Sequence, residues 1–412
     1  MRSNFAALLF STVAGDLIAP IFALYLPLYA LQLGADPLEI GLVGGVSWAS
    51  YSFAPYLIGR YSDRVRMRKA FIVVSLVMLT FCSFTYVLVE SPVQLIALRL
   101  VEGVAWSILW PVMDVAISED ASWESTKALS IYNAVWSTAG AIGPLLGGSL
   151  ILLFAGSIRD VFLVTALLTA ASVVVMVLFF REGSRPAAPV EGPADGAEAP
   201  TVEVRRGRRP GRRARDLFWV FVLGMIMISS VRGVLFTFYP PLAQSQGVSI
   251  AVIALIGFTF GAGRAVVFVL STRDEIRGFI LDDRNVERVL LAALGLSAIG
   301  GVLPLAGDRS GAIGFLAFGV VAFSGSFLVS ASQANFISRA EPHKRGAGAG
   351  IFESTIGIGL AISPILAGLF SGGSLSLPFL VVPVEFAISV PVFLYLLRRA
   401  RVPRDPDGGQ RR

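Results

Sequence analysis

The chain has 412 residues, of which 55% are hydrophobic and only 15% are charged. Soluble domains carry charges on about a quarter of their residues, so this composition excludes a water-soluble globular protein and indicates a lipid environment. With one histidine, His343, and one cysteine, Cys82, the chain cannot form a histidine metal cluster, a thiolate metal site or an internal disulfide. We expect no metal and no cofactor.

Apolar runs long enough to cross a bilayer recur along the chain. A spanning helix needs about 20 mostly apolar residues. Such runs occur at 5–31, 38–59, 70–89, 93–117, 128–153 and 160–180, and again at 217–243, 249–271, 287–306, 311–337, 347–371 and 376–397. The sequence therefore predicts an all-α integral membrane protein with twelve transmembrane helices, six in each half.

The stretch 182–215 separates the two halves. It is rich in Pro, Ala, Gly and charged residues, so it cannot bury a core and is expected to be a flexible cytoplasmic linker. We expect its arginine-rich end to lie against anionic lipid headgroups. The predicted domains are an N-terminal six-helix bundle at 1–181, a C-terminal bundle at 216–400 and a cytoplasmic tail at 401–412.

Basic residues lie almost entirely on one side of the predicted membrane. With both termini in the cytoplasm, 29 of the 34 Lys and Arg residues fall in cytoplasmic segments and two fall in outer loops. This is the positive-inside pattern. It predicts a multi-pass plasma-membrane protein with both termini cytoplasmic. Because topology accounts for the net charge of +6, a nucleic-acid partner is not expected.

The two halves resemble each other in sequence. Aligned without a gap, 117–148 and 337–368 share eight of 32 residues, including the pairs Ala141/Ala361, Pro144/Pro364 and Gly148/Gly368. Each stretch covers the end of the fourth span, an inner loop and the fifth span of its half. Duplicated halves with a substrate site between them are typical of secondary transporters. The repeat therefore predicts two pseudo-symmetric bundles.

The loop after the second predicted span holds one acid among five bases. It reads Gly59-Arg-Tyr-Ser-Asp-Arg-Val-Arg-Met-Arg-Lys69 and is similar to the signature loop of the Major Facilitator Superfamily. The matching residues are Gly59, Asp63, Arg64, Arg68 and Lys69, whereas Arg66 and Met67 depart from the pattern. The resemblance implies that Asp63 helps to latch the halves on the cytoplasmic side. The alternative is an ordinary basic inner loop.

The fourth span carries charges within the membrane. Its segment Arg99-Leu-Val-Glu-Gly103 resembles an element of the same superfamily in which the arginine is linked to proton coupling. Arg99 and Glu102 are i, i+3 neighbours on one helix face, and Trp106, Trp110 and Asp114 continue near that stripe. A charge at the bilayer centre costs at least ~2.5 kcal/mol, so a polar cavity or mutual pairing must compensate it. A purely structural ion pair is the alternative.

The fifth span contains Gly143-Pro144-Leu-Leu-Gly147-Gly148. This segment resembles the G-P-x-x-G-G element typical of antiporters in the superfamily. The alternative is ordinary packing of small residues. Together the motifs identify the chain as similar to the Major Facilitator Superfamily, and most like its multidrug efflux proton antiporters. The resemblance implies two six-helix bundles that transport by alternating access.

Other polar residues in the predicted spans are candidates for a central site, because ionisable groups in membranes are costly. Asp16, Arg232 and Glu385 lie near the middles of their spans and are expected to share one cavity, with Asp16 as the first choice for a protonatable carboxyl group. Glu353 lies nearer the cytoplasm and is a candidate gate or latch. The candidate substrate contacts are Tyr25, Trp106, Trp110, Asn133, Trp136 and Gln333.

The leading functional hypothesis is proton-coupled efflux of a small amphipathic or cationic molecule. Uptake or facilitated transport of a sugar, organic acid or other metabolite is the runner-up, since Arg232 and Arg264 would suit an anion. Receptor or enzyme functions are disfavoured because no catalytic cluster and no separate soluble domain is evident. The expected partners are the lipid bilayer, a small-molecule substrate and protons, and the expected state is a monomer.

Overall fold

The computed structural model describes residues 2–65, 67–118, 125–181, 212–271, 273, 275, 285–307, 309–333 and 345–400. The first half contains α1 (Arg2–Gln32), α2 (Pro37–Val65), α3 (Arg68–Val87), α4 (Pro92–Ser118), α5 (Ser125–Leu153) and α6 (Ile158–Phe179). The second half contains α7 (Arg212–Ser245), α8 (Ile250–Ser271), α10 (Val286–Val302), α11 (Ala312–Gln333), α12 (Arg345–Leu369) and α13 (Val381–Ala400). The short 3-10 turns η1 (Leu303–Ala306) and η4 (Leu377–Leu380) precede α11 and α13.

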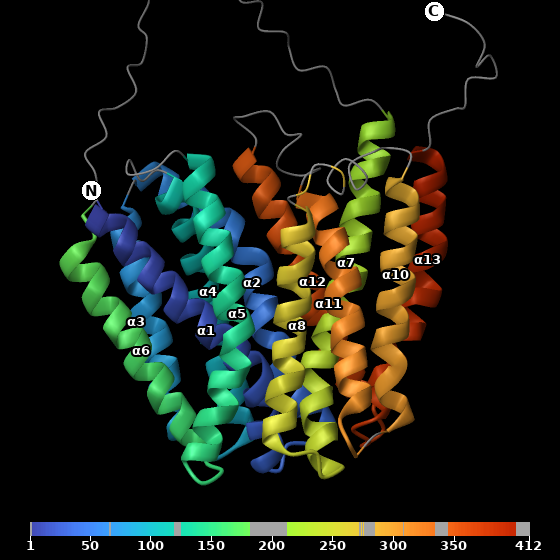
Figure 1. Ribbon diagram of the computed structural model, residues 1–412, viewed down its shortest axis with the longest axis horizontal. Helices are drawn as coiled ribbons and strands as arrows, with labels where there is room; N and C mark the ends of the chain where they lie inside the picture. Colours follow the sequence, from blue (N-terminus) through green and yellow to red (C-terminus); the bar gives the residue numbers. More distant parts are fainter. Residues whose placement is uncertain are drawn as a thin grey trace, which may run out of the picture.

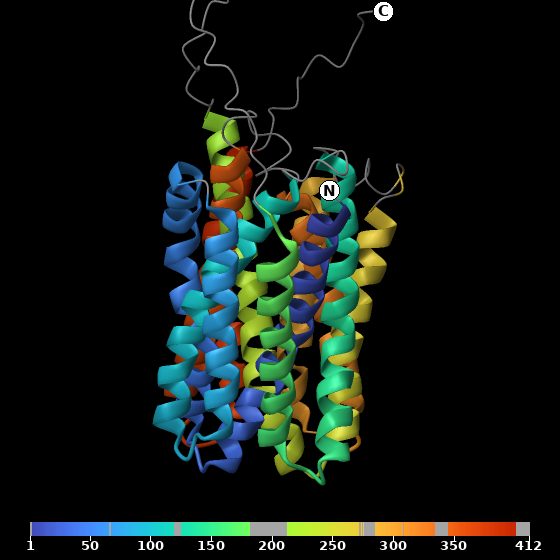
Figure 2. The same ribbon diagram turned by 90° about the vertical axis from the view of Figure 1, so that its left-hand side faces the viewer.

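The helices form two bundles that lie side by side. Helices α1 to α6 make one bundle and α7 to α13 make the other (Figure 1), and all of them run along roughly one axis (Figure 2). Each of the twelve predicted spans corresponds to one α-helix, and no strand occurs among the described residues. The prediction of an all-α fold with twelve long helices is therefore confirmed.

Eleven of these helices are long and apolar enough to cross a membrane by length and composition. Helix α2 is not among the eleven, and the side chains of only 37–53 and Ile58 are described in it. Its apolar residues are interspersed with glycine, serine, tryptophan and tyrosine. It packs against α4, α7 and α12, so protein rather than lipid surrounds much of its surface. Helix α7 begins at Arg212, inside the predicted linker 182–215. The rest of that linker and the tail 401–412 lie outside the described residues.

The bundles meet along two seams, and small residues bring the backbones together at both. In the seam between α5 and α8, a Cβ added to Gly257 would lie 2.8 Å from the Pro144 side chain. A Cβ on Gly261 would lie 2.4 Å from the Ala141 Cα, and one on Gly148 would lie 2.5 Å from the Ala254 Cβ. Side chains larger than hydrogen therefore do not fit at these glycines without displacing the partner helix.

The seam between α2 and α12 repeats this arrangement. A Cβ on Gly41 would lie 2.4 Å from the Pro364 carbonyl oxygen, and one on Gly45 would lie 2.5 Å from the Ala361 oxygen. A Cβ on Gly368 would lie 2.5 Å from the Pro37 carbonyl oxygen, in the first turn of α2. Small residues permit this close helix approach within a membrane.

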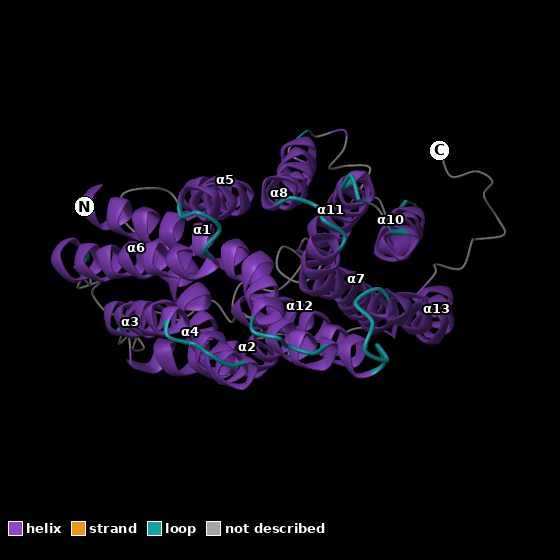
Figure 3. Cartoon of the chain, turned by 90° about the horizontal axis from the view of Figure 1, so that it is seen from below, coloured by secondary structure: helices purple, strands orange, loops and turns teal. Residues whose placement is uncertain are grey.

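The two seams are related by the internal repeat. The pairs Ala141/Ala361, Pro144/Pro364 and Gly148/Gly368, which align in the sequence, occupy equivalent positions in the two contacts. On the opposing helices, Gly41 and Gly45 correspond to Gly257 and Gly261 with the same spacing. Seen along the bundle axis, α2 lies beside α12 and α5 beside α8 (Figure 3).

We predict that Gly45→Ala destabilises the protein and slows transport, whereas Gly140→Ala does neither. The added methyl group at Gly45 collides with a backbone carbonyl, which cannot rotate away, while Gly140 has nothing within 4 Å of an added Cβ. Overpacking of this kind costs about 1–3 kcal/mol. Unfolding of both purified variants in detergent measures the difference. Equal stability of the two would show that the α2–α12 seam tolerates a side chain.

Candidate functional site

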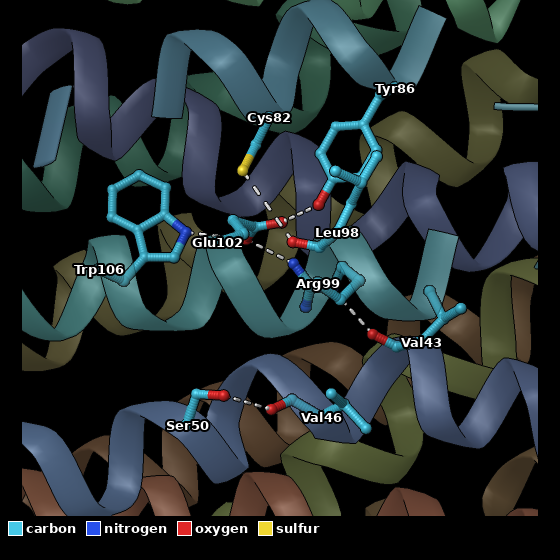
Figure 4. Close-up of polar contacts among 9 residues, drawn as sticks. All are labelled: Val43, Val46, Ser50, Cys82, Tyr86, Leu98, Arg99, Glu102 and Trp106. Carbon is cyan, nitrogen blue, oxygen red and sulfur yellow. Dashed lines mark hydrogen bonds and ion pairs between the residues drawn. The ribbon is translucent and has the colours of Figure 1, made fainter. Parts of the chain in front are cut away.

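Two groups of charged side chains are buried between the helices. They differ in how completely ion pairs and hydrogen bonds satisfy their charges. The first is centred on Glu102 of α4 (Figure 4). Its carboxylate accepts hydrogen bonds from the Tyr86 hydroxyl at 2.5 Å, from Arg99 Nη1 at 2.5 Å and from the Trp106 indole N–H at 2.8 Å. Arg99 and Glu102 are both buried. Each charge is therefore matched by its neighbour and by neutral donors.

This group also ties α4 to α2. Arg99 Nε donates to the Val43 carbonyl of α2 at 2.8 Å. One turn along α4, a Cβ on Gly103 would lie 2.2 Å from the Ser47 carbonyl oxygen. The R-x-x-x-G spacing thus places the Arg99 side chain and the bare backbone of Gly103 one turn apart on α4, both against the same face of α2. A closed pair of this kind favours the structural interpretation of Arg99 and Glu102.

The second group, here called the central cluster, comprises Asp16, Asp114, Glu353, Arg232 and Arg264. Each acid is held by an aromatic donor rather than by an arginine. Trp110 hydrogen-bonds Asp16, Tyr132 hydrogen-bonds Asp114, and the Tyr51 hydroxyl donates to Glu353 Oε2 at 3.0 Å. The Oδ1 atom of Asp114 is buried and has no hydrogen-bond partner among the described residues.

Both arginines of the central cluster lie against aromatic rings. The Arg264 guanidinium lies 3.8 Å from the centre of the Trp136 ring on α5 and 5.4 Å from that of Phe268. Arg232 lies 5.4 Å from Phe260 and 5.8 Å from Phe236. Within the described part of the chain, neither guanidinium has a carboxylate within ion-pair distance. Cation–π contacts stabilise the charges but leave the N–H groups available.

The members of the central cluster interact electrostatically across the two bundles. Asp16 of α1 is repelled by Asp114 of α4 and attracted by Arg264 of α8. Glu353 of α12 is attracted by Arg264 and by Arg232 of α7. The cluster therefore joins charges that the sequence separates into both halves, as a site between two bundles requires.

The position of the cluster follows from the order of residues along the seam helices. In α2 and α8, Tyr51 and Arg264 come after the seam glycines, whereas in α5 and α12 Trp136 and Glu353 come before the seam residues. Because α2 and α8 run opposite to α5 and α12, all four side chains lie on the same side of the seams. That side is the end where α1 begins and α13 ends (Figure 1).

An aromatic wall lines a small pocket between α1, α2 and α4. Trp106 and Trp110 stack at 4.7 Å, Trp110 stacks with Trp48 at 6.2 Å, and Tyr51 meets Trp110 edge-on at 5.4 Å. Ala19 and Ala23 of α1 complete this pocket together with Arg99 and Glu102. The wall joins the closed pair to the central cluster, because Trp106 contacts Glu102 and Trp110 contacts Asp16.

Several predicted site residues lie elsewhere. Tyr25 is fully buried and donates to the Pro144 carbonyl at 2.6 Å, and Gly147 packs on its ring. Gly143 approaches the Leu17 carbonyl of α1. The G-P-x-x-G-G element thus packs α5 on α1 through Gly143 and Gly147, and on α8 through Pro144 and Gly148.

Glu385 does not join Asp16 and Arg232, with which it was expected to share a cavity. Its Oε1 accepts a hydrogen bond from Ser363 of α12 at 2.5 Å, and no member of the central cluster interacts with it. Glu385 was assigned to that cavity because it lies near the middle of its span. The position along a span does not determine which face of the helix the side chain occupies.

The predicted latch is described only in part. Gly59, Asp63 and Arg64 belong to the last turns of α2, but their side chains are not among those described. The same holds for Asn133 and Gln333. Arg68 is buried at the start of α3, and Lys69 Nζ donates to the Val177 carbonyl at 2.8 Å. The latch function of Asp63 stays a prediction.

The structure also brings in residues that the sequence reading did not single out, namely Trp48, Tyr51 and Tyr86. Trp48 and Tyr51 are i, i+3 neighbours on α2, so one helix face presents both rings. The i, i+3 spacing could therefore have indicated these two residues from the sequence. No comparable signal exists for Tyr86, because its hydroxyl reaches Glu102 on the next helix.

We predict that Glu102→Gln lowers the free energy of unfolding by about 3–5 kcal/mol, because it leaves the buried Arg99 charge uncompensated. Combining it with Arg99→Gln should recover part of that loss. Glu90→Gln, at an exposed position, is the matched control and should change little. Unfolding of the single and double variants in detergent gives the coupling energy. A double variant that loses the sum of the single effects would contradict the pairing.

Comparison with known proteins identifies the family. A family model described as the Major Facilitator Superfamily matches residues 5–274 and 276–412. Multidrug resistance protein MdtG of Dickeya zeae strain Ech586 is 30% identical over 184 residues, which cover 44% of this chain and 42% of that protein. Multidrug efflux pump SdrM of Staphylococcus aureus strain N315 is 26% identical over 175 residues, which cover 40% and 38%. The alignments span less than half the length of these relatives.

Solved structures share the fold over nearly their full length. The nucleoside transporter NupG aligns with 98% of this chain and 100% of its own at a TM-score of 0.71 and 13% identity. A bacterial homolog of the human lysosomal transporter Spinster, inward-facing and occupied, aligns with 97% and 98% at a TM-score of 0.71 and 15% identity. With two related bundles, a charged site between them and a family match along almost the whole sequence, this chain belongs to the Major Facilitator Superfamily of membrane transporters.

Proposed function

We propose that the chain exports a small amphipathic cation across the plasma membrane in exchange for protons. The observation that carries this proposal is the charge balance of the central cluster. It contains three carboxyl groups and two guanidinium groups, so the described residues leave one carboxylate in excess. Charge inside a membrane protein is costly unless it is balanced. The site therefore favours one additional positive charge.

A proton and a monovalent cation each satisfy that balance, but the two together exceed it. Protonation of one carboxyl group brings the cluster to neutrality, and so does a bound cation with all three carboxyl groups ionised. Binding of one therefore disfavours binding of the other. Competition of this kind, combined with alternating exposure to the two sides, gives exchange of substrate for proton.

Asp114 is the carboxyl group that we assign to the exchangeable proton. Its Oδ1 atom lacks a hydrogen-bond partner among the described residues, and no arginine is among the groups that act on it, whereas Asp16 and Glu353 are both attracted by Arg264. A buried carboxylate with an unsatisfied oxygen gains more from protonation than a paired one does. Asp16, the first choice from sequence, then serves mainly in balancing charge.

The aromatic wall of Trp48, Tyr51, Trp106 and Trp110 supports an amphipathic substrate, because aromatic faces attract both apolar rings and cations. The printed names of the relatives, a multidrug resistance protein and a multidrug efflux pump, support export. One chain contains both bundles, so we propose a functional monomer. We place both termini in the cytoplasm on the distribution of Lys and Arg.

Proton-coupled uptake of an organic anion is the second candidate. Arg232 and Arg264 lie on aromatic rings with no carboxylate at ion-pair distance among the described residues, and such guanidinium groups bind carboxylates or phosphates well. An anion would increase the negative charge of the cluster. Its binding would therefore promote protonation of the acids, and substrate and proton would travel together.

We predict that Asp114→Asn abolishes export driven by a proton gradient and also slows exchange of substrate for substrate, because the cluster is then neutral without a proton and a bound cation leaves one positive charge in excess. Proteoliposomes loaded with ethidium as a cationic probe measure both processes. Asp160→Asn, at the outer end of α6, is the matched control and should behave as the wild type. Gradient-driven export by Asp114→Asn at the wild-type rate would refute the assignment.

The sign of proton exchange on binding separates the two candidates. In weakly buffered detergent solution, a cationic substrate should release protons from the wild type, whereas an anionic substrate should take them up. A matched set of 2-naphthylmethylammonium, 2-naphthamide and 2-naphthoate keeps the ring constant and changes the charge. Proton uptake with 2-naphthoate alone would replace cation export by anion uptake.

A further inference from the structure

A second polar site lies in the C-terminal bundle, away from the central cluster. Glu385 of α13 accepts a hydrogen bond from the Ser363 hydroxyl of α12 through Oε1, at 2.5 Å. Its Oε2 atom is buried and has no partner among the described residues. The Ser230 hydroxyl of α7 lies beside the same carboxyl group. Ser230 is only 1% exposed, and its Oγ atom has no partner at hydrogen-bond geometry among the described residues.

This carboxyl group has no basic neighbour. The groups that act on Glu385 are the Ser363 and Ser230 hydroxyls, and no charged group on the described parts of α7, α10 or α12 interacts with it. An isolated carboxylate within a membrane is unstable. It must carry a proton or have a cation beside it. The unsatisfied Oε2 atom of Glu385 and Oγ atom of Ser230 belong to neighbouring groups and are the atoms that such a ligand would contact.

Helix α12 offers a further oxygen three residues before Ser363, the carbonyl of Leu360. Because Pro364 has no N–H, the Leu360 carbonyl lacks its usual donor one turn ahead. Helix α7 shields this region, since a Cβ on Gly233 would lie 3.0 Å from the Pro364 ring and 3.2 Å from the Leu360 Cα. Coupling-ion sites in secondary transporters commonly use carbonyl groups freed at irregular helix positions. The available ligands are all hard oxygen atoms.

We propose that Glu385, Ser363 and Ser230 bind one monovalent cation, Na⁺ or H⁺, at a site separate from the central cluster. A single carboxylate balances one positive charge, whereas a divalent ion would leave an unpaired charge in the membrane. The site borders the α2–α12 seam, because the carbonyl of Pro364, next to Ser363, is the group that meets Gly41. Occupancy therefore acts on the position of α12 against the other bundle.

Thermal unfolding of the purified protein tests this proposal without requiring transport. If the ion is Na⁺, then at alkaline pH, where protons are scarce, NaCl should raise the Tm of the wild type by about 2 °C or more over the same concentration of choline chloride. Glu385→Gln should abolish the difference, and Ser363→Ala should reduce it. Glu90→Gln, which removes an exposed acid of the same type, should retain the full difference.

The two cations are distinguished by a second series in choline chloride at several pH values. If the ion is H⁺, the Tm of the wild type falls as the pH rises. Glu385→Gln then makes that fall smaller, leaving the part due to Asp114, and Na⁺ has no effect. If the ion is Na⁺, the salt difference appears at fixed pH. Because each variant is compared with itself, a general loss of stability does not obscure the result. A wild type that shows neither a Na⁺ effect nor a pH dependence sensitive to Glu385→Gln overturns the proposal.

Discussion

The close approach of backbones at the two seams is the constraint on which the rest of the structure depends. Gly41 and Gly45 of α2 and Gly257 and Gly261 of α8 allow the opposing helices to touch through carbonyl oxygens and small side chains. Side chains here would separate the bundles. The aromatic and charged residues further along the same helices would then no longer meet across the interface, as Tyr51 and Glu353 do.

The buried charges are divided between structural support and chemistry by how completely they are paired. Glu102 has three donors and holds α3, α4 and, through Arg99, α2 together. The acids of the central cluster have single aromatic donors, and its arginines rest on rings. Full pairing fixes a position, whereas partial pairing leaves free energy to be gained from a ligand. The helices thus keep a rigid frame around a site that can change its charge.

The helices and the pairing of Arg99 with Glu102 could be predicted from sequence, because hydropathy and i, i+3 spacing are local properties. The contact between Tyr51 and Glu353 could not, since 302 residues separate them and neither half alone contains the site. Arg264 was recognised as a charge within a span, but its position over Trp136 depends on the α5–α8 seam. Glu385 was misplaced for a related reason, because its helix face is decided by the packing of α13 on α7 and α12.

A joint made of glycines also has to come apart in a transporter. Bulky interlocking side chains would leave deep pits on both surfaces when two helices separate, and lipid tails or water would have to fill them. Gly41 and Gly45 leave a nearly smooth surface, and their N–H and C=O groups remain bonded within α2. In the proposed transport cycle, the same residues that permit tight closure would therefore also keep the barrier to separation low, so that neither form is trapped.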